Sequence, residues 1–578
     1  MVYSVAGTEN ALSVFSIKQV NKYNLSKINH QETVMGINRR QFLFRTGALA
    51  AASFIPLAVS WPVTGWAAQS ADSLVLGFSN EPSSLDPHWH IVSANAALTT
   101  YLFDRLVKSD NTQRPRPGLA KSWKVIDDTT WEFELQPNVK FHNGEPLTVD
   151  DVIFSFDRAS HIVGSPFALR TYLHDKTVVK ISDSVFRIKT AAPNPIVPNE
   201  LATVAIISRS AAKATTADYN SGKAVNGTGP YKLVNYIPGN RIVLTRNENY
   251  WSDKPQWKEI TIRPISADGA RVAALLSGDV NVIEKVAPTD IARLKSNGAI
   301  NLTRSVTNRA IFLSFDHGRK RSPFIRDNAG QPIDNPLLDL RVRQAFQLAI
   351  DTQLIVRHIL TDAAEVASQL VPQGIFGHSN AIKPVRADPQ KAKALLTAAG
   401  YPQGFRITLH SPNDRFIRDS AVAQAVAQML SRVGIKTEVE TMPSSVFYKR
   451  VTGDANGSDF SFFLVGYGSA TGESSSPLRS LLHTIDKEKG FGSSNRSFYS
   501  NKKVDALIEQ GLITLDDSKR EALFSSAIEL AIADVALLPL YHPINVWGLR
   551  KPLVYPGRSD EQTIAMDIGT TGSVESQK

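Results

Sequence analysis

Apolar and charged positions alternate along several short stretches of this chain, and a clear case lies between residues 131 and 135. Trp131, Phe133 and Leu135 fall on one face of an extended segment, and Glu132 and Glu134 fall on the other. Because successive side chains of a strand point to opposite faces, this pattern predicts a strand with one buried and one wet surface. Further strands are predicted over residues 74–78, 231–236, 241–246, 280–283, 405–409, 436–439 and 536–541.

The helices are indicated by their start and stop residues. Thr148 precedes Asp150 and Asp151 at a predicted helix start. The Thr148 side chain can accept a hydrogen bond from a free backbone amide there, and the negative charge of the two aspartates stabilises that end of the helix. Asp339 is a second predicted N-cap, and Gly278, Gly400 and Gly434 are predicted C-terminal stops. Helices are predicted over residues 94–106, 271–278, 389–399 and 419–433. Helix and strand alternate after residue 339, which predicts an α/β region.

Length and composition set the class of protein. At 578 residues the chain is too long for a single core, so two or three domains are expected. Charged residues make up 20% and hydrophobic residues 42%, which is ordinary for a soluble globular protein. The formal net charge is +10, but no basic run of the kind that binds nucleic acid is present. Cysteine is absent, which excludes disulfides, thiolate nucleophiles, Cys-ligated zinc and a lipidated N-terminal cysteine.

The first 68 residues read as a leader with an export signal. Arg39 and Arg40 precede Phe42-Leu43, an apolar run extends from residue 46 to 63, and small residues follow near Ala67 and Ala68. These are the three parts of an export signal, and the paired arginines resemble a twin-arginine signal. The prolines in the apolar run make it a poor permanent span, although a retained anchor helix is the alternative. Removal is expected near Ala67 or Ala68, and the true start is expected at Met35.

No catalytic constellation stands out. Thr228 occupies the place where a phosphate-binding loop needs lysine, and no HExxH motif is present. His88 and His90 at i and i+2 could share a metal ion, but such pairs are more often structural. His142 with Asp150 or Asp151 could form an acid and base pair, although His142-Asn143-Gly144 is typical of a turn. We therefore predict a protein that is not an enzyme and has no cofactor or bound metal.

Several motifs in a fixed order carry a resemblance to a known family. They are GTGPY at 227–231, RNENYW at 246–251, EPSSLDP at 81–87 and the long stretch from LAKSW at 119–123 to DVIFSF at 151–156. With them the chain resembles the extracytoplasmic solute-binding proteins of family 5, which serve ABC importers of dipeptides, oligopeptides and nickel. The resemblance implies an α/β fold of the periplasmic binding protein type II class, with two lobes, a hinge and an extra small subdomain. One crossing between the lobes is expected just upstream of Gly227.

The resemblance also implies domain boundaries. Lobe I comprises residues 69–107, 208–310 and 541–578, the small subdomain residues 108–207, and lobe II residues 311–540, after the leader at 1–68. The implied function is that of a periplasmic protein that captures a peptide, or a peptide-like or opine-like solute, by lobe closure and delivers it to a permease in the inner membrane. A monomer is expected, without nucleic-acid partners. The alternatives are a binding protein for a metal chelate or haem, with His88, His90 or His142 facing the cleft, and a secreted hydrolase on the same fold.

Candidate ligand contacts combine local chemistry with the resemblance. Arg415 follows a predicted strand and precedes a helix, so its guanidinium could bind a carboxylate or phosphate through two hydrogen bonds. In dipeptide binders of the family an arginine at this place holds the ligand carboxylate, and an aspartate pairs with the free amine. Here Ala470 stands at the aspartate position, so Glu473 could supply the charge instead, or the ligand has no free amine. Tyr467, Phe416 and Trp547 are candidate stacking walls.

Overall fold

The computed structural model describes residues 72–571, except residues 92, 166–168, 454–457 and 470. The predicted leader over residues 1–68, with its start at Met35 and its cleavage near Ala67 or Ala68, lies outside the described residues, and so does Ala470. Within the described part of the chain, no helix combines the length and the apolar character needed to cross a membrane.

The first lobe is built on a mixed sheet. Its central strand β1 (Ser73–Phe78) lies parallel to β10 (Glu259–Pro264) on one side and to β11 (Val282–Ile283) on the other. The hairpin of β8 (Tyr231–Ile237) and β9 (Arg241–Arg246) extends the sheet by antiparallel pairing, as the sequence predicts. The apolar side chains of β1 share one buried core with the first helix. The helices of this lobe are α1 (Ser93–Leu102), α5 (Thr216–Asn220), α6 (Asp268–Ser277) and α7 (Pro288–Lys295).

Gly227 and Gly229 fix the entry to this hairpin against the end of α1. A Cβ on Gly227 would lie 2.0 Å from the carbonyl oxygen of Leu102, and one on Gly229 would lie 2.4 Å from the carbonyl carbon of Leu102. These glycines are thus required for close backbone approach. The segment stays within the first lobe, so the predicted lobe crossing just upstream of Gly227 is wrong.

The small subdomain inserts a separate antiparallel sheet. Its strand order is β4-β5-β7-β6, and β5 (Thr130–Leu135) buries Trp131, Phe133 and Leu135 as the alternation predicts. Helix α2 (Val149–His161) begins as predicted, because the Asp151 carboxylate accepts a hydrogen bond from the Thr148 amide at 2.9 Å. The other elements are β2 (Val107–Ser109), β3 (Pro115–Pro117), β4 (Ala120–Asp127), β6 (Lys176–Lys180), β7 (Val185–Thr190), α3 (Arg170–Leu173) and α4 (Val197–Leu201).

The second lobe has its own sheet, in the order β14-β16-β18-β13, with β17 beside β16. Helix α8 (Leu340–Ala349) begins at the predicted cap, where the Asp339 carboxylate accepts from the Arg341 amide at 2.8 Å. Apolar faces of α8, α10 and α11 share the core with the sheet. The remaining strands are β13 (Arg309–Phe315), β14 (Ile325–Arg326), β15 (Ala364–Val366), β16 (Arg406–Pro412), β17 (Lys436–Met442) and β18 (Phe462–Gly468). The remaining helices are α9 (Thr352–Leu354), α10 (Pro389–Ala398), α11 (Asp419–Ser431), α12 (Ser444–Thr452), α13 (Ser475–Pro477), α14 (Lys502–Ile513) and α15 (Asp517–Ala533).

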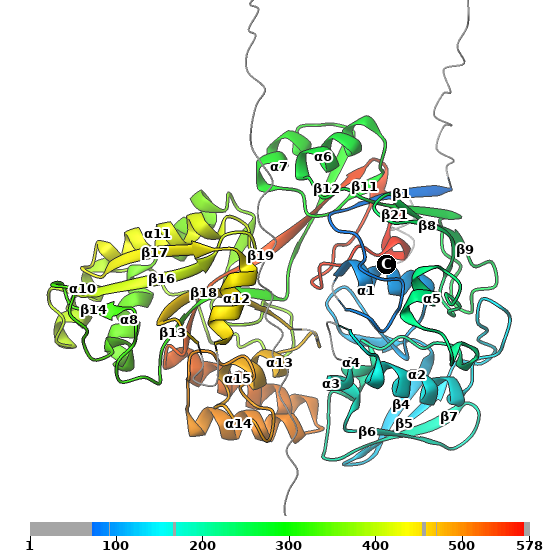
Figure 1. Ribbon diagram of the computed structural model, residues 1–578, viewed down its shortest axis with the longest axis horizontal. Coiled ribbons are helices and arrows are strands. Elements are labelled where there is room, and N and C mark those ends of the chain that lie inside the picture. The colour runs from blue at the N-terminus through cyan, green and yellow to red at the C-terminus, as the bar shows by residue number, and fades with distance from the viewer. Residues whose placement is uncertain (1–71, 92, 166–168, 454–457, 470, 572–578) are drawn as a thin grey trace, which may run out of the picture. The chain divides into compact units, whose positions relative to one another are not determined.

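Two neighbouring crossings connect the lobes. The chain leaves the first lobe through β12 (Ile300–Val306), passes Thr307 and Asn308, and enters the second lobe as β13. The long strand β19 (Leu537–Arg550) pairs with β13 at its start and with β12 at its end, so it belongs to both sheets (Figure 1). The Thr307 amide donates to the Pro543 carbonyl at 2.9 Å, which ties the two crossings together. After β19, the C-terminal segment returns to the first lobe through β20 (Leu553–Val554) and β21 (Gly569–Thr570).

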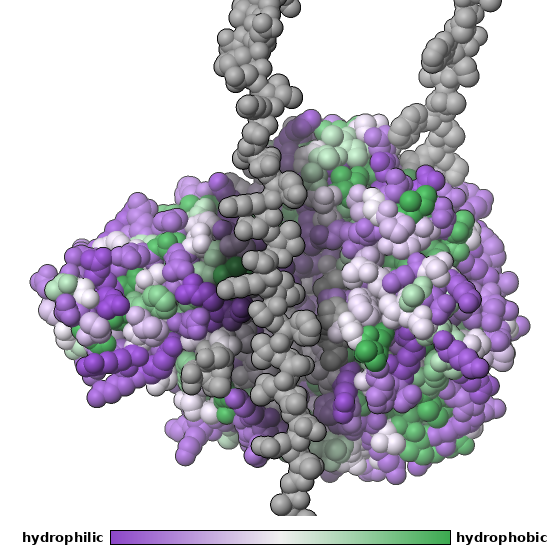
Figure 2. Space-filling view, in the orientation of Figure 1, coloured by the Kyte–Doolittle hydropathy of each residue, from purple (hydrophilic) through white to green (hydrophobic). Residues whose placement is uncertain are grey.

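The surface is largely hydrophilic on the face shown in Figure 2, and apolar residues are interspersed among polar ones on both lobes. The distribution is that of a protein whose apolar side chains are used mainly in its cores.

Candidate functional site

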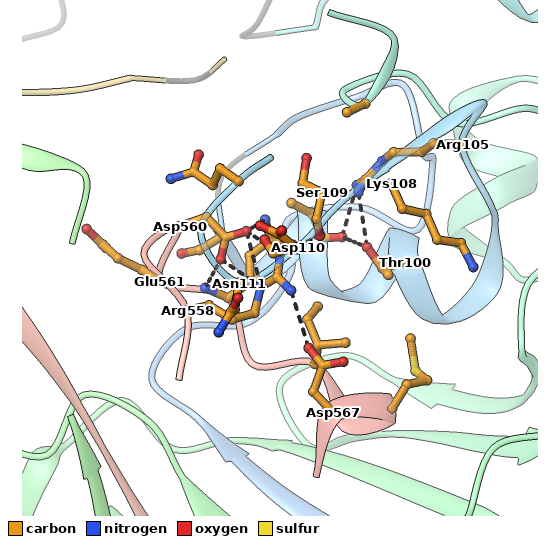
Figure 3. Close-up of a pocket in the computed structure, with 18 of the residues that line it drawn as sticks. Thr100, Arg105, Lys108, Ser109, Asp110, Asn111, Arg558, Asp560, Glu561 and Asp567 are labelled. Atoms are coloured by element: carbon orange, nitrogen blue, oxygen red, sulfur yellow. Dashed lines mark hydrogen bonds and ion pairs between the residues drawn. The ribbon is translucent and has the colours of Figure 1, made fainter. Parts of the chain in front are cut away.

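A cavity of about 1250 Å³ lies where the first lobe, the C-terminal segment and the edge of the second lobe meet. The first lobe contributes residues of α1, and the small subdomain contributes residues around β2 and α4. The C-terminal segment contributes residues between 554 and 569, and the second lobe contributes Arg415 and residues 468, 469 and 471. Figure 3 shows part of the first-lobe and C-terminal wall, where charged side chains gather. We call this space the first cavity.

Arg415 lies three residues after the end of β16 and lines the first cavity. The Asp419 carboxylate accepts from the backbone amides of Arg415 at 3.0 Å and of Phe416 at 3.1 Å, and so fixes the turn between β16 and α11. The guanidinium itself is exposed and makes no hydrogen bond or ion pair with another described residue. It is therefore available for an anionic group in the cavity.

Arg558 is the most heavily bonded cation of the cavity wall. Its guanidinium bonds Asp560 at 2.8 and 3.0 Å, lies 3.3 Å from Asp567, and donates to the carbonyls of Ser109 and Asp110 at 3.0 Å each (Figure 3). Burial alone would lower the pKa of Arg558, but the carboxylate of Asp560 outweighs it and raises that pKa. The arrangement fixes the C-terminal segment onto β2 and uses most of the guanidinium donors within the protein.

Arg309 and Glu561 form a second pair on the same wall, with a different character. The Arg309 Nε donates to Glu561 Oε1 at 3.3 Å, and the two side chains keep 28% and 20% of their surface exposed. No other described residue bonds the Arg309 Nη atoms or Glu561 Oε2. Both residues line the first cavity, so a donor and an acceptor remain available there.

A hydrogen-bond bridge closes the cavity beside the crossing. The Asn308 amide donates to Gln113 Oε1 at 3.0 Å and to the Ser469 carbonyl at 2.6 Å. Gln113 in turn donates to Ser559 Oγ at 3.0 Å. The bridge connects the small subdomain, the crossing, the second lobe and the C-terminal segment, so a change in lobe angle must act on it.

Glu473, the predicted substitute for the missing aspartate, lies beyond this bridge and outside the lining of the first cavity. It faces a second cavity of about 700 Å³ between the small subdomain and the second lobe. Its carboxylate bonds Arg520 at 2.6 Å, and both side chains are at least 95% buried. The Arg520 guanidinium also lies 4.1 Å from the centre of the Phe376 ring and 2.9 Å from Asp517. The charge of Glu473 is thus already compensated by a neighbour 47 residues away along the chain.

The three predicted aromatic walls lie apart from the first cavity. Trp547 is completely buried in the core of the first lobe, and its indole donates to Thr563 at 2.9 Å. Phe416 packs against the core of the second lobe, and Tyr467 bonds Ser476 at 3.1 Å on the other side of β18. Aromatic side chains that could stack on a ligand are equally typical of core positions.

The histidines that a metal chelate or haem would need are used structurally. His88 is fully buried, with Nε2 2.9 Å from the Ala205 carbonyl and Nδ1 3.1 Å from Arg158, and burial lowers its pKa to about 4. His142 has Nε2 3.0 Å from the Gly229 carbonyl, and burial likewise lowers its pKa to about 4. Neither residue lines the first cavity, and neither does His90.

Sequence reasoning did not single out three further residues of the cavity wall. Gln113, Lys285 and Glu561 line the first cavity with φ angles of 65°, 50° and 64°, in the left-handed region that non-glycine residues rarely adopt. Such backbone strain gathers at functional sites more often than elsewhere. The sign of φ leaves no trace in local sequence at these positions, since none is glycine or asparagine.

Comparison with known proteins agrees with this geometry. The family model of the bacterial extracellular solute-binding proteins, family 5 Middle, matches residues 114–489. The probable D,D-dipeptide-binding periplasmic protein DdpA of Escherichia coli K12 is 26% identical over 515 residues, which cover 87% of this chain and 94% of DdpA. The glutathione-binding protein GsiB of Pectobacterium atrosepticum is 28% identical over 509 residues, covering 87% of this chain and 92% of GsiB.

Solved structures show the same fold. HbpA2 from Haemophilus parasuis superposes with a TM-score of 0.75 at 23% identity, covering 86% of this chain and all of HbpA2. The unliganded open form of MppA, a periplasmic murein tripeptide-binding protein, superposes with a TM-score of 0.73 at 22% identity, covering 86% of this chain and 97% of MppA. The two lobes, the paired crossings and the match over most of the chain lead to one conclusion: the chain belongs to the bacterial extracellular solute-binding proteins of family 5.

Proposed function

We propose that this protein captures a carboxylate-bearing peptide, or a peptide-like or opine-like solute, in its first cavity and delivers it to an ABC permease in the inner membrane. It would act in the periplasm after export through the twin-arginine route, as a monomer and without catalysis.

The observation that carries the proposal is the uncompensated guanidinium of Arg415. An exposed arginine in a cavity between lobes, held in place through its backbone by Asp419, is the arrangement that a carboxylate or phosphate ligand completes. Because Arg415 belongs to the second lobe and most of the wall belongs to the first, a solute that bonds both would favour the closed arrangement of the lobes. A ligand shifts this equilibrium only by its different affinity for the two arrangements.

Charge balance supports a solute that carries both signs. The wall holds equal numbers of acidic and basic side chains: Glu81, Asp104, Asp110, Asp253, Asp560, Glu561 and Asp567 against Arg105, Lys108, Lys254, Lys285, Arg309, Arg415 and Arg558. The relatives DdpA and GsiB are named for a dipeptide and for glutathione, and MppA for a murein tripeptide. A peptide-class solute fits both observations, whereas the buried bonding of His88 and His142 speaks against a metal chelate or haem.

The proposal is tested with the mature protein from its own periplasm. Native mass spectrometry, compared with the denatured mass, weighs any retained solute, and fragmentation identifies its class. Calorimetric titration of the emptied protein then follows with dipeptides, glutathione, an opine and a nickel–histidine chelate.

Arg415→Ala is expected to weaken binding of a carboxylate solute by about 10- to 100-fold, the worth of a charge-assisted hydrogen bond. The matched control is Arg432→Ala, which removes an exposed arginine from the same lobe away from the cavity. Unchanged affinity in Arg415→Ala, or binding of the nickel chelate alone, would contradict the proposal.

A further inference from the structure

A peptide-class solute brings an ammonium group as well as a carboxylate, and the first cavity offers few carboxylates that can receive it. Three acidic groups of the wall are bonded by the protein at both carboxylate oxygens. Asp104 accepts from Thr228, Tyr250 and Trp251, Asp110 from Thr112, Arg114 and Arg116, and Asp560 from Arg558 and Gln562. A solute ammonium at these positions would have to displace existing donors.

Glu561 differs from these three in having an unused oxygen, which Glu81 and Asp567 also have, and its carboxylate is the one paired with the partly exposed Arg309. Its Oε1 accepts a single hydrogen bond, from Arg309 Nε at 3.3 Å, and no described residue bonds Oε2. The side chain is 20% exposed, so it is partly desolvated and still accessible. In Figure 3 it points away from the cluster of Arg558, Asp560 and Asp567. A half-buried carboxylate with a free oxygen binds a cation more strongly than an exposed one, because the local dielectric is lower.

The backbone of Glu561 adopts a strained conformation that presents the carboxylate to the cavity. Its φ of 64° is left-handed, which a glycine would adopt without strain, while the residue before it, Asp560, is held by Arg558. Strained conformations persist when the surrounding structure fixes them and are concentrated where a side chain must be presented in one direction. The result is that the carboxylate reaches the cavity beside Arg309, which itself lies against Gly468 of β18.

Two other acidic residues are poorer candidates. Glu473 is at least 95% buried, bonded to Arg520, and faces the second cavity. Asp253 lines the first cavity but is exposed to solvent, where an ion pair is worth little.

We propose that Glu561 is the residue that recognises the ammonium group of the solute. Arg309 is the residue that positions the carboxylate of Glu561. The inference rests on the proposed function and deepens it: Arg415 in the second lobe would bond the carboxylate end, and Glu561 in the C-terminal segment would bond the amine end. The solute class is then a peptide with both termini free.

The test uses a pool of random tripeptides with free amines and the same pool after N-acetylation. Emptied protein is equilibrated with each pool, and the bound fraction is separated by ultrafiltration and measured by mass spectrometry. The wild type is expected to retain the free-amine pool at least about tenfold better than the acetylated pool. Glu561→Gln keeps the shape of the side chain and is expected to abolish this preference while leaving retention of the acetylated pool unchanged.

Two matched variants make the outcome specific. Asp253→Asn removes an exposed carboxylate from the same cavity and is expected to preserve the preference. Arg415→Ala is expected to reduce retention of both pools equally. If Glu561→Gln retains the wild-type preference, Glu561 does not bind the amine, and the proposed function stands without it. If the wild type retains neither pool, the peptide function itself fails and the inference with it.

Discussion

The first cavity has two arginine–carboxylate pairs on one wall, Arg558–Asp560 and Arg309–Glu561. The two pairs serve different purposes. Arg558 bonds Asp560 twice, contacts Asp567 and donates to two carbonyls, so most of its donors are used within the protein. Arg309 and Glu561 share one bond of 3.3 Å and leave atoms free on both partners. Sequence distance does not separate the two, because Asp560 and Glu561 are neighbours. What separates them is saturation: a saturated pair holds the fold, and an unsaturated pair on a cavity wall can bind a solute.

The largest effect is expected from breaking the saturated pair. Arg558→Met removes the charged partner of Asp560 and the donor to two backbone carbonyls in a buried setting, which costs about 3–5 kcal/mol of folding free energy. Urea unfolding followed by circular dichroism measures it. A loss under about 1 kcal/mol would show that the Arg558–Asp560 pair does not hold the fold and does not differ in this respect from Arg309–Glu561.

Acidification is expected to act on the backbone that carries Arg309. His542 is buried, donates from Nδ1 to the Arg309 carbonyl at 2.9 Å, and burial lowers its pKa to about 4. The unfolded chain therefore binds more protons between pH 6.5 and 4, so the free energy of unfolding falls as pH falls through this window, by up to ~3 kcal/mol from this residue.

The measurement for His542 is the difference in unfolding free energy between wild type and His542→Gln at pH 7 and pH 4.5. Glutamine keeps a side-chain donor but does not titrate, so the variant should lose less stability on acidification. Parallel pH profiles would mean that His542 does not contribute, since His88 and His142, whose pKa values are also about 4, are common to both proteins.

Arg309→Met tests the unsaturated pair in the way that Arg558→Met tests the saturated one. Both partners are partly exposed and joined by one bond, so the loss of stability should stay below about 1 kcal/mol. The same urea experiment applies, with the two methionine variants side by side. Equal losses in both would remove the distinction on which the assignment of Glu561 depends.

Local sequence patterns predicted much of the fold, whereas the candidate site depends on contacts between residues far apart in the sequence. The alternation at Trp131 and Phe133 and the caps at Thr148 and Asp339 are confirmed, because each depends on residues within a few positions of one another. The boundary expected between residues 310 and 311 lies close to the crossing at Thr307 and Asn308, whereas the glycines near 227 serve close packing on Leu102.

The site was less accessible to sequence reasoning for the same reason. Arg415 was singled out because the end of a strand is a local feature, and it does line the cavity; its role in binding stays a prediction. Glu473 has no partner nearby in the sequence, and its charge is compensated by Arg520, which lies 47 residues further on. Glu561 is placed on the cavity wall by its left-handed backbone and by its hydrogen bond to Arg309, which lies 252 residues away. The residues next to Glu561 in the sequence indicate neither feature.

The smallest expected change in stability concerns Glu561 itself. Glu561→Gly relieves the left-handed backbone, worth about 1–2 kcal/mol, but adds the entropy of glycine in the unfolded chain and removes the bond to Arg309, so the net change should lie within about 0.5 kcal/mol of zero. Glu561→Ala removes the same carboxylate and keeps the strain, so it should be less stable than the glycine variant by about 1 kcal/mol. Thermal unfolding of the two variants measures this difference, and both should lose the preference for free amines. A glycine variant that is no more stable than the alanine variant would mean that the backbone at 561 is not strained, and the carboxylate would then owe its position to Arg309 alone.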